Sequence, residues 1–440
     1  MVANHISSLF LFLFLFLFCY ASPSVSDSSS FTLSGILSSP QFFHSNHARM
    51  LSSFKIFIYP LSTAPQEAPH FKLPWLLQSQ DTSVLFFYLL SQSSFVTHDP
   101  EAAGLYFIPP FYSSSLSSSS SSSLPEMVPL NRKKSARDLV QKLREEFPFW
   151  QRTLGGDHFF GVCHRFPGDG SRNVLELQKN AISMACSELF CNNDDGSTNI
   201  TQEEGMDPQF FPHKDIVLPP FQNDSLHNKK EAIAEEYLLS RPRAYLVYAM
   251  DSMNTVARKL WLHDSEFLFH SDQDLSETSQ NWAETGQGTS QTDQNESGSS
   301  QDIPQTIASS KFCLTFATQG LIKIRKKKSI SIVDAMVAGC VPVIISHGYL
   351  HSLPFQDILD WTKFSVIVSS SEDMGKLKAY LKAMPEAKYR ELQRNAISAS
   401  THFQWNVPPT PYDAFYMIMH QLWLRQHSVR YARRNMGIQS

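Results

Sequence analysis

The sequence predicts an α/β protein with parallel β-sheets, and three observations lead to this fold class. First, residues 312–316 form a short apolar run, which is typical of a buried strand. Second, residues 332–337 carry apolar side chains at three- and four-residue spacing, and Gly339, a common helix end, follows them. Third, residues 341–345 are mostly β-branched, as in strands buried on both faces. A strand, a helix and a strand at this spacing predict a parallel crossover unit.

The crossover unit also predicts where a ligand binds. Sheets of this kind bind ligands beyond the carboxyl ends of their strands. Here these ends are the segment after Leu314 and the sequence Ser346-His347-Gly348. We therefore expect a binding site beside these two segments.

The first half of the chain alternates between strand-like and helix-like stretches. Short apolar runs beside Pro or Gly predict strands at residues 54–59, 105–109, 159–162 and 214–220. Apolar side chains on one helical face predict helices at residues 75–91 and 136–147. This alternation indicates α/β architecture here as well.

The second half surrounds the crossover unit with further elements. Apolar runs predict strands at residues 243–249 and 364–368. Helical spacing predicts helices at residues 256–262, 374–384, 389–399 and 412–423. Residues 271–306 are rich in Ser, Gln, Thr, Asp and Gly, which predicts a long surface loop without structure.

Composition excludes some classes of protein. The chain has 440 residues, of which 42% are hydrophobic and 18% charged, so two or three domains can bury cores. The formal net charge is −4 at pH 7, whereas a nucleic-acid-binding protein is normally basic. We therefore expect no nucleic acid among its partners.

The N-terminus directs the chain to the secretory pathway. Residues 9–20 are a Leu/Phe tract that is shorter than the ~20 residues of a membrane span. This tract is either a signal peptide cleaved near Ala21 or a short signal anchor. Residues 22–53 are Ser-rich and predict a flexible stem. Glycosylation sequons, which agree with a lumenal body, begin at Asn199, Asn223 and Asn295.

The cysteines leave their pairing open. The chain has six, and Cys19 lies in the apolar tract, so at least one of the remaining five is unpaired or bonds outside the chain. Cys186 and Cys191 are close enough in sequence to bridge, but the sequence does not decide it. Cys340, between a helix and a buried strand, is predicted to be a packed thiol.

Candidate catalytic residues follow a pair of glycines. Gly155 and Gly156 permit a tight turn, which places Asp157 and His158 at the edge of an apolar strand. These two side chains are our candidates for a general base. The alternative, which the local pattern favours, is that they satisfy backbone groups at the turn.

Asp334 has two interpretations as well. It lies in the first turn of the predicted helix, where a carboxylate can hold the ribose of a nucleotide. It can equally be a charge that stabilises the helix end.

Several of these stretches together resemble the exostosin-type glycosyltransferases, in particular the plant cell-wall members. The resemblance spans about residues 54–423 and keeps the order of the family's motifs. The motifs lie at residues 55–59, 97–109, 155–160, 214–219, 310–314, 334–345, 353–355, 359–361, 402–403 and 413–415.

The resemblance implies a GT-B architecture, in which two Rossmann-like domains face a cleft. It implies a nucleotide-sugar donor, UDP-linked, on the C-terminal domain and an acceptor glycan on the N-terminal domain. It also implies inversion at the sugar carbon with no cofactor and no obligatory metal. The place it implies is the Golgi membrane, with a lumenal catalytic region; secretion after signal cleavage is the alternative.

These considerations divide the chain into five parts. They are a signal segment at 1–21, a stem at 22–53, an acceptor-side domain at 54–235, a nucleotide-sugar domain at 236–425 that contains the 271–306 loop, and a tail at 426–440.

The sequence departs from the family pattern near the predicted donor site. Ser331 stands where the family has an Arg, and His347 where it has an Asp. The segment between the strand and the helix contains a basic run that begins at Arg325, which is either a solvated loop or a source of charge for the diphosphate. Our donor-binding candidates are Arg325, Asp334, Ser346 and His347.

Two functions follow from this resemblance. The first is a Golgi glycosyltransferase that acts on a cell-wall polysaccharide or a glycoprotein glycan. The second is a catalytically impaired homologue that binds glycans or supports partner glycosyltransferases.

Overall fold

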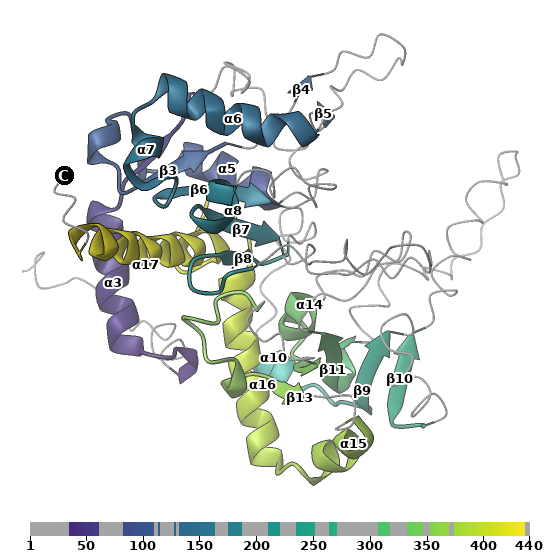
Figure 1. Cartoon of the computed structure of the whole chain (residues 1–440). Coiled ribbons are helices and arrows are strands. Elements are labelled where there is room, and N and C mark those ends of the chain that lie inside the picture. Colours follow the sequence, from purple (N-terminus) through teal and green to yellow (C-terminus); the bar gives the residue numbers. More distant parts are fainter. Residues whose placement is uncertain are drawn as a thin grey trace, which may run out of the picture.

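Two parallel β-sheets, one in each half of the chain, organise the structure (Figure 1). The structure is a computed structural model. It describes residues 35–60, 82–109, 113–114, 127–128, 132–162, 175–186, 210–220, 235–250, 264–270, 307–316, 332–345, 353–368 and 374–435. The predicted α/β class with two Rossmann-like domains is confirmed by these two sheets.

The N-terminal sheet contains six strands, all of them parallel to their neighbours. Their order across the sheet is β2 (Val96–Thr97), β1 (Ile56–Ile58), β3 (Leu105–Ile108), β6 (His158–Val162), β7 (Ile182–Cys186) and β8 (Ile216–Leu218). A separate antiparallel pair joins β4 (Ser113–Ser114) to β5 (Met127–Val128).

Helices cover both faces of this sheet. Along β3, Leu105 and Phe107 point to a core shared with α5 (Thr82–Ser91), whereas Tyr106 and Ile108 point to the opposite face. That face is covered by α6 (Arg132–Glu146), α7 (Phe149–Thr153) and α8 (Leu175–Lys179). Alternate burial on two faces explains why every side chain of β3 is apolar or aromatic.

The C-terminal sheet contains five parallel strands. Their order is β10 (Phe267–His270), β9 (Tyr245–Met250), β11 (Ser310–Phe316), β12 (Val341–Ile345) and β13 (Val366–Val368). The helix α14 (Ile332–Val337) lies between β11 and β12 in the sequence, so the predicted crossover unit is confirmed. Other helices of this half are α10 (Glu235–Ser240), α15 (Met374–Ala383) and α16 (Glu386–Ser400), and 3₁₀ turns lie at η6 (Trp361–Lys363) and η7 (Thr401–Phe403).

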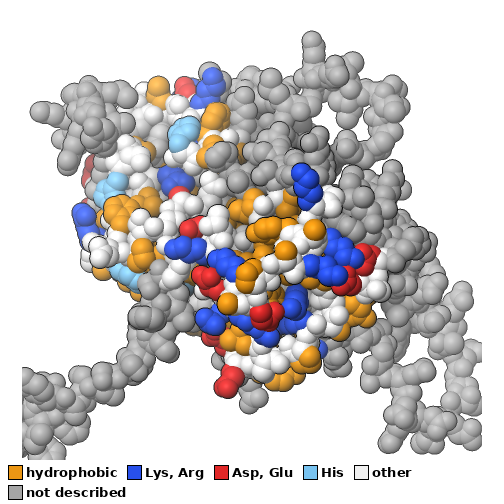
Figure 2. Space-filling view, turned by 90° about the horizontal axis from the view of Figure 1, so that it is seen from below, with side chains coloured by type: hydrophobic (Ala, Val, Ile, Leu, Met, Phe, Trp, Pro, Cys, Tyr) orange, Lys and Arg blue, Asp and Glu red, His pale blue; other side chains and the backbone are white. Residues whose placement is uncertain are grey.

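The surface of the C-terminal domain mixes charges of both signs with apolar side chains, as Figure 2 shows from below. Ion pairs join Lys378 to Asp264 and Glu266, and Lys311 to Glu386. The first two pairs connect α15 to the residues that precede the edge strand β10.

The last helix, α17 (Ala414–Asn435), returns to the N-terminal domain (Figure 1). It packs on β8, and its residues Phe415, Ile418 and Leu422 share one core with Leu105 and Phe107 of the N-terminal sheet. Two parts of the predicted division are therefore corrected. Much of α17 belongs to the N-terminal packing, not to a 236–425 domain, and the 426–440 tail is helical as far as Asn435.

The 22–53 stem is also corrected. Its second part forms the helix α3 (Pro40–Ser53), which lies against α17 (Figure 1). Proline begins this helix, and Phe43, His47 and Met50 are buried on one face at helical spacing. Just before it, Leu37 forms a β-bridge with Leu359 of the C-terminal half. The Ser-rich composition conceals this buried stripe.

The cysteine prediction needs a correction too. Cys340 is not a free thiol, because it forms a disulfide with Cys313 of β11. Cys186 is also disulfide-bonded, and the other three cysteines lie outside the described residues. The pairing was hidden from the sequence because 27 positions separate Cys313 from Cys340.

Several predictions concern residues that the structure does not describe, namely the signal segment, the 256–262 helix and the 271–306 loop. Among the described residues, no helix has both the length and the apolar character needed to cross a membrane.

Candidate functional site

The turn before β6 buries the predicted Asp157–His158 pair completely. Gly155 adopts φ +85°, and a Cβ there would lie 2.7 Å from the Trp150 ring, so only glycine fits. The turn brings Thr153 within hydrogen-bond reach of Asp157, whose side chain accepts the Thr153 hydroxyl. The side chains of His158 and Asp157 are 0% and 1% exposed.

A series of hydrogen bonds connects the pair to Tyr59, the residue that follows β1. The Asp157 carboxylate lies 2.8 Å from His158 Nδ1, and the Tyr59 hydroxyl lies 2.6 Å from His158 Nε2. Because a carboxylate only accepts, Nδ1 donates to Asp157, and the neutral ring then accepts the Tyr59 proton at Nε2. Burial, with a smaller effect of Asp157, raises the pKa of Tyr59 far above its ordinary value. The tyrosine therefore remains a neutral donor.

The position of this series of hydrogen bonds in the sheet bears on its role. His158 is the first residue of β6, and the backbone carbonyl of Asp157 accepts the amide of Tyr106 in β3. The pair thus lies where the strand begins, whereas ligands in parallel sheets bind where strands end. A general base must contact the proton that it removes. Burial and position together favour the alternative interpretation, a structural pair that satisfies the turn.

The donor candidates are only partly described. Asp334 lies half-buried in the first turn of α14. As the crossover helix of a parallel unit, α14 runs back towards the start of β12, so its first turn is the end of the helix nearer to the carboxyl edge of the sheet. Arg325, Ser346 and His347 lie outside the described residues.

Two neighbouring strands end together at this edge. Phe316, the last residue of β11, pairs with Ile345, the last residue of β12. The chain leaves β12 directly into Ser346 and His347, and it leaves β11 into the segment that contains Arg325. The register therefore brings the starts of both predicted donor segments to adjacent positions.

Several other motif residues have structural roles that their chemistry explains. Asp413 caps α17, accepting the amides of Thr410 at 2.8 Å and Tyr416 at 3.2 Å. Asp360 caps η6 by accepting the Thr362 amide. His402 donates from Nδ1 to the Tyr412 carbonyl at 2.7 Å, and burial lowers its pKa. These motif positions serve folding.

The sequence did not predict the roles of two residues: Tyr59, which binds His158, and Arg243, which binds the Ala338 carbonyl after α14. Tyr59 ends the β1 run and gave no signal beyond its aromatic character. Arg243 precedes β9, and its role as a partner of backbone carbonyls has no sequence signature. Asp215, in the motif before β8, fixes a turn by accepting the amides of Ser183 and Phe211.

No group of three or more His, Cys, Asp or Glu side chains among the described residues is placed to hold a metal ion.

The comparison with protein families identifies the chain. The exostosin GT47 domain matches residues 50–384, which is most of its length.

The chain belongs to the exostosin GT47 family. This family domain extends over both sheets, from α3 to the end of α15. It makes the chain a glycosyltransferase.

Plant relatives agree with this assignment. A probable glycosyltransferase of Arabidopsis thaliana is 25% identical over 408 residues, covering 92% of this chain and 68% of its own. A probable glucuronoxylan glucuronosyltransferase of the same plant, IRX7, is 25% identical over 391 residues, covering 85% and 77%. The family is thus related to plant glucuronosyltransferases.

Among solved structures, WaaG, a glycosyltransferase of lipopolysaccharide biosynthesis, aligns with 84% of this chain and 99% of its own. The identity is 10% and the TM-score is 0.33. A score this low supports no inference about the site.

Proposed function

We propose that this glycosyltransferase transfers a sugar from a UDP-sugar to a cell-wall polysaccharide or a glycoprotein glycan, with inversion at the sugar carbon. One observation supports the donor site most directly: β11 and β12 end side by side, and α14, which connects them in the sequence, carries Asp334 in its first turn, the end of the helix nearer to that edge. A nucleotide in such a site has its ribose within reach of a carboxylate. We assign Asp334 to the ribose hydroxyls.

The diphosphate needs positive charge or N–H donors as it departs. We propose that Arg325 supplies that charge and that Ser346 and His347 donate hydrogen bonds. In the sequence, Ser346 and His347 directly follow β12, and Arg325 lies in the segment between β11 and α14. The scheme needs neither a cofactor nor an obligatory metal.

Calorimetry with UDP and a set of UDP-sugars tests this proposal on the full chain. We expect saturable binding of UDP, and an Asp334→Asn chain should bind at least about ten-fold more weakly, since it loses hydrogen bonds to a charged acceptor. Asp360→Asn is the matched control, because Asp360 caps η6 and should leave UDP binding unchanged. Absence of UDP binding to the wild-type chain would refute the proposed donor.

We propose that the N-terminal apolar tract holds the protein in the Golgi membrane with both domains in the lumen, and that Asn199, Asn223 and Asn295 carry glycans. Sensitivity of the chain to a glycosidase, and its position in a membrane fraction, would check this. A soluble, non-glycosylated product in plant cells would contradict it.

A second function rests on a specific observation. The complete burial of Asp157 and His158 leaves both predicted base candidates inaccessible. This favours a homologue that binds glycans and supports partner glycosyltransferases. The test is a deletion that lowers the activity of a partner: restoration by an Asp334→Ala chain would favour the supporting role, and failure of that chain would favour catalysis.

A further inference from the structure

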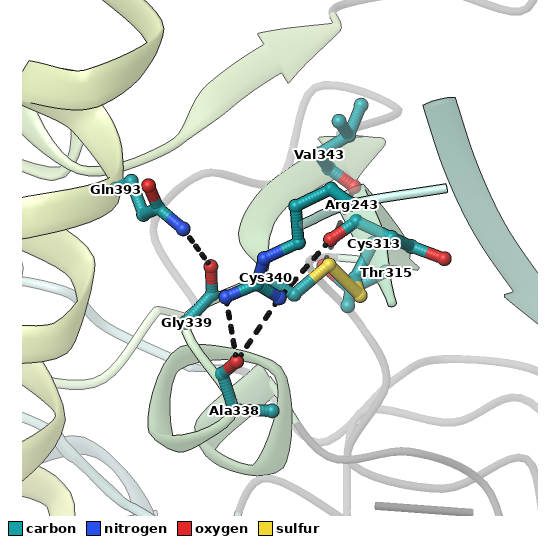
Figure 3. Close-up of a disulfide and its surroundings, with 9 residues drawn as sticks. Arg243, Cys313, Thr315, Ala338, Gly339, Cys340, Val343 and Gln393 are labelled. Carbon is teal, nitrogen blue, oxygen red and sulfur yellow. Dashed lines mark hydrogen bonds between the residues drawn. A yellow bond between two sulfur atoms is a disulfide. The ribbon is translucent and has the colours of Figure 1, made fainter. Parts of the chain in front are cut away.

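The turn between α14 and β12 (residues 338–340, the α14–β12 turn) is held from three directions, as Figure 3 shows. Cys340 is bonded to Cys313 of β11. Gln393 of α16 donates to the Gly339 carbonyl at 3.1 Å. The guanidinium of Arg243 donates twice to the Ala338 carbonyl, from Nη1 at 3.2 Å and Nη2 at 3.1 Å.

Arg243 also binds two other elements. Nη1 donates to the carbonyl of Ser310, where β11 begins, at 3.3 Å, and Nη2 donates to the carbonyl of Leu238 in α10 at 3.1 Å. One planar side chain therefore connects α10, β11 and the end of α14. A lysine has no such fork and cannot reproduce this set of bonds.

The charge of this arginine is held by carbonyl groups. Burial lowers its pKa, Arg241 and Arg390 lower it further, and Tyr389 has the opposite effect. Carbonyl groups at the ends of α10 and α14 supply the partial negative charge that holds it. Gly339 lies directly against the Arg243 guanidinium: it has φ +69°, and a Cβ there would lie 2.7 Å from Arg243 Nη2.

All these contacts lie at the amino edge of the C-terminal sheet, where β9, β11 and β12 begin. The predicted donor ligand Asp334 lies one turn earlier in the same short helix, and its backbone carbonyl accepts the Ala338 amide at 3.0 Å. Arg243 therefore contacts the carboxyl-terminal end of α14, at the amino edge of the sheet, and does not itself reach a donor at the carboxyl edge.

We propose that Arg243 is a positioning residue for the nucleotide-sugar site: it fixes the end of α14 on the sheet and thereby places Asp334 against the donor. This inference rests on the proposed function. A displacement of about 1 Å in a functional group can cost about 10²-fold in rate. We expect donor affinity to respond in the same direction, so an unfixed α14 lowers that affinity while the fold persists.

Two measurements on the full chain test this inference. Hydrogen exchange of residues 332–340 reports whether α14 is fixed, without any donor, and calorimetry with UDP reports the site. In Arg243→Gln we expect faster exchange of α14 and UDP binding weaker by about ten-fold. Arg243→Lys should be intermediate, and Gly339→Ala, which displaces the guanidinium from the opposite side, should resemble Arg243→Gln.

Arg241→Gln is the matched control, because Arg241 lies two residues earlier and should leave both measurements at the wild-type value. Unchanged exchange in Arg243→Gln would overturn the inference. Faster exchange with unchanged UDP affinity would also overturn it, and would show a purely structural role. If the wild-type chain binds no UDP, the proposed function falls and the positioning role with it, while the exchange result still measures how Arg243 fixes α14.

Discussion

At the scale of single residues, two buried hydrogen bonds join Tyr59 to His158 and His158 to Asp157. Breaking the first should lower stability without lowering activity. Tyr59→Phe removes the hydroxyl and with it the 2.6 Å hydrogen bond to His158 Nε2 in a fully buried site. We expect a loss of about 1–3 kcal/mol in the free energy of unfolding, which denaturant titration measures. The transfer rate well below the melting temperature should stay within a factor of two or so, because the pair is buried and lies where β6 begins, away from the carboxyl ends of the strands.

Tyr380→Phe is the control for this prediction, since Tyr380 is 59% exposed and should change stability by less than about 0.5 kcal/mol. A stable His158→Asn chain without transferase activity would contradict the structural role and restore His158 as a base candidate.

The roles of single residues depend more on three-dimensional context than the helices and strands do. The Gly-Gly turn correctly placed Asp157 and His158 at the start of a strand, and the structural alternative was visible in the pattern. The sequence could not show which sheet edge they occupy or that Tyr59, 99 positions away from His158, completes the series of hydrogen bonds. Arg243 was missed for a related reason, because its partners are backbone carbonyls, which every residue possesses.

At the scale of elements, the disulfide between Cys313 and Cys340 holds α14 to β11. It closes a loop across 27 positions, which corresponds to about 3–4 kcal/mol in a loop-entropy estimate. We expect the Cys313→Ala/Cys340→Ala chain to lose stability of this order in thermal unfolding. Because Cys186 is also bonded, reduction of the wild-type chain should lower stability at least as much. Equal stability of the oxidised double variant and the wild type would contradict this prediction.

The helix α3 provides a second test at this scale, through two adjacent residues on different faces. Met50 is 0% exposed and Leu51 is 51% exposed. Met50→Asp places a carboxylate in the core shared with α17 and should cost several kcal/mol. Leu51→Asp, the matched control, should change stability by less than about 0.5 kcal/mol. Similar denaturation midpoints for both variants would show that α3 is not docked in solution.

Most elements were predictable from periodicity. β12 and α14 were predicted with their observed limits, and β3, β11, α15 and α16 within a few residues, because each is a buried run or has a clear apolar stripe. The elements that were missed have weaker signals. The edge strands β2 and β10 are short, β7 contains a Ser among its five residues, and the stripe of α3 includes a histidine.

At the scale of the whole molecule, the two ends of the described chain meet. The helix α3 packs on α17, and Arg425 of α17 pairs with Asp357 of the C-terminal half at 2.7 Å while donating to carbonyls at residues 214 and 215 before β8. One hydrophobic core contains side chains of both halves, among them Phe107 of β3 and Ile344 of β12. The sequence predicted two domains, but it did not predict that α17, which follows the second half, packs on the sheet of the first. The apolar pattern of a single helix does not indicate which sheet it covers.

The contact between α3 and α17 buries two histidines. The rings of His47 and His420 lie 5.9 Å apart. The Phe43 ring stacks on His47 at 5.5 Å and lies tilted against His420 at 4.6 Å. Besides burial, the neighbouring His44 also lowers the pKa of His47. Asp357, itself paired with Arg425, is the one acid among the described groups that acts on His420, and it raises that pKa. Two imidazolium charges at this distance would repel each other in a site with little water.

The α3–α17 contact should therefore weaken in acid. Burial lowers the pKa of His47 and of His420 from 6.5 to about 4, so both are neutral in the folded chain and take up protons more readily when unfolded. Their contribution to stability is complete above pH 6.5 and is lost as the pH falls from 6.5 towards 4, by an amount on the order of 2–3 kcal/mol per histidine. Urea titrations between pH 7.5 and 4 measure this slope. In His47→Phe/His420→Phe, which keeps the ring packing and removes both titrating groups, the slope should become shallower. A double variant with the wild-type slope would assign the acid sensitivity to other groups.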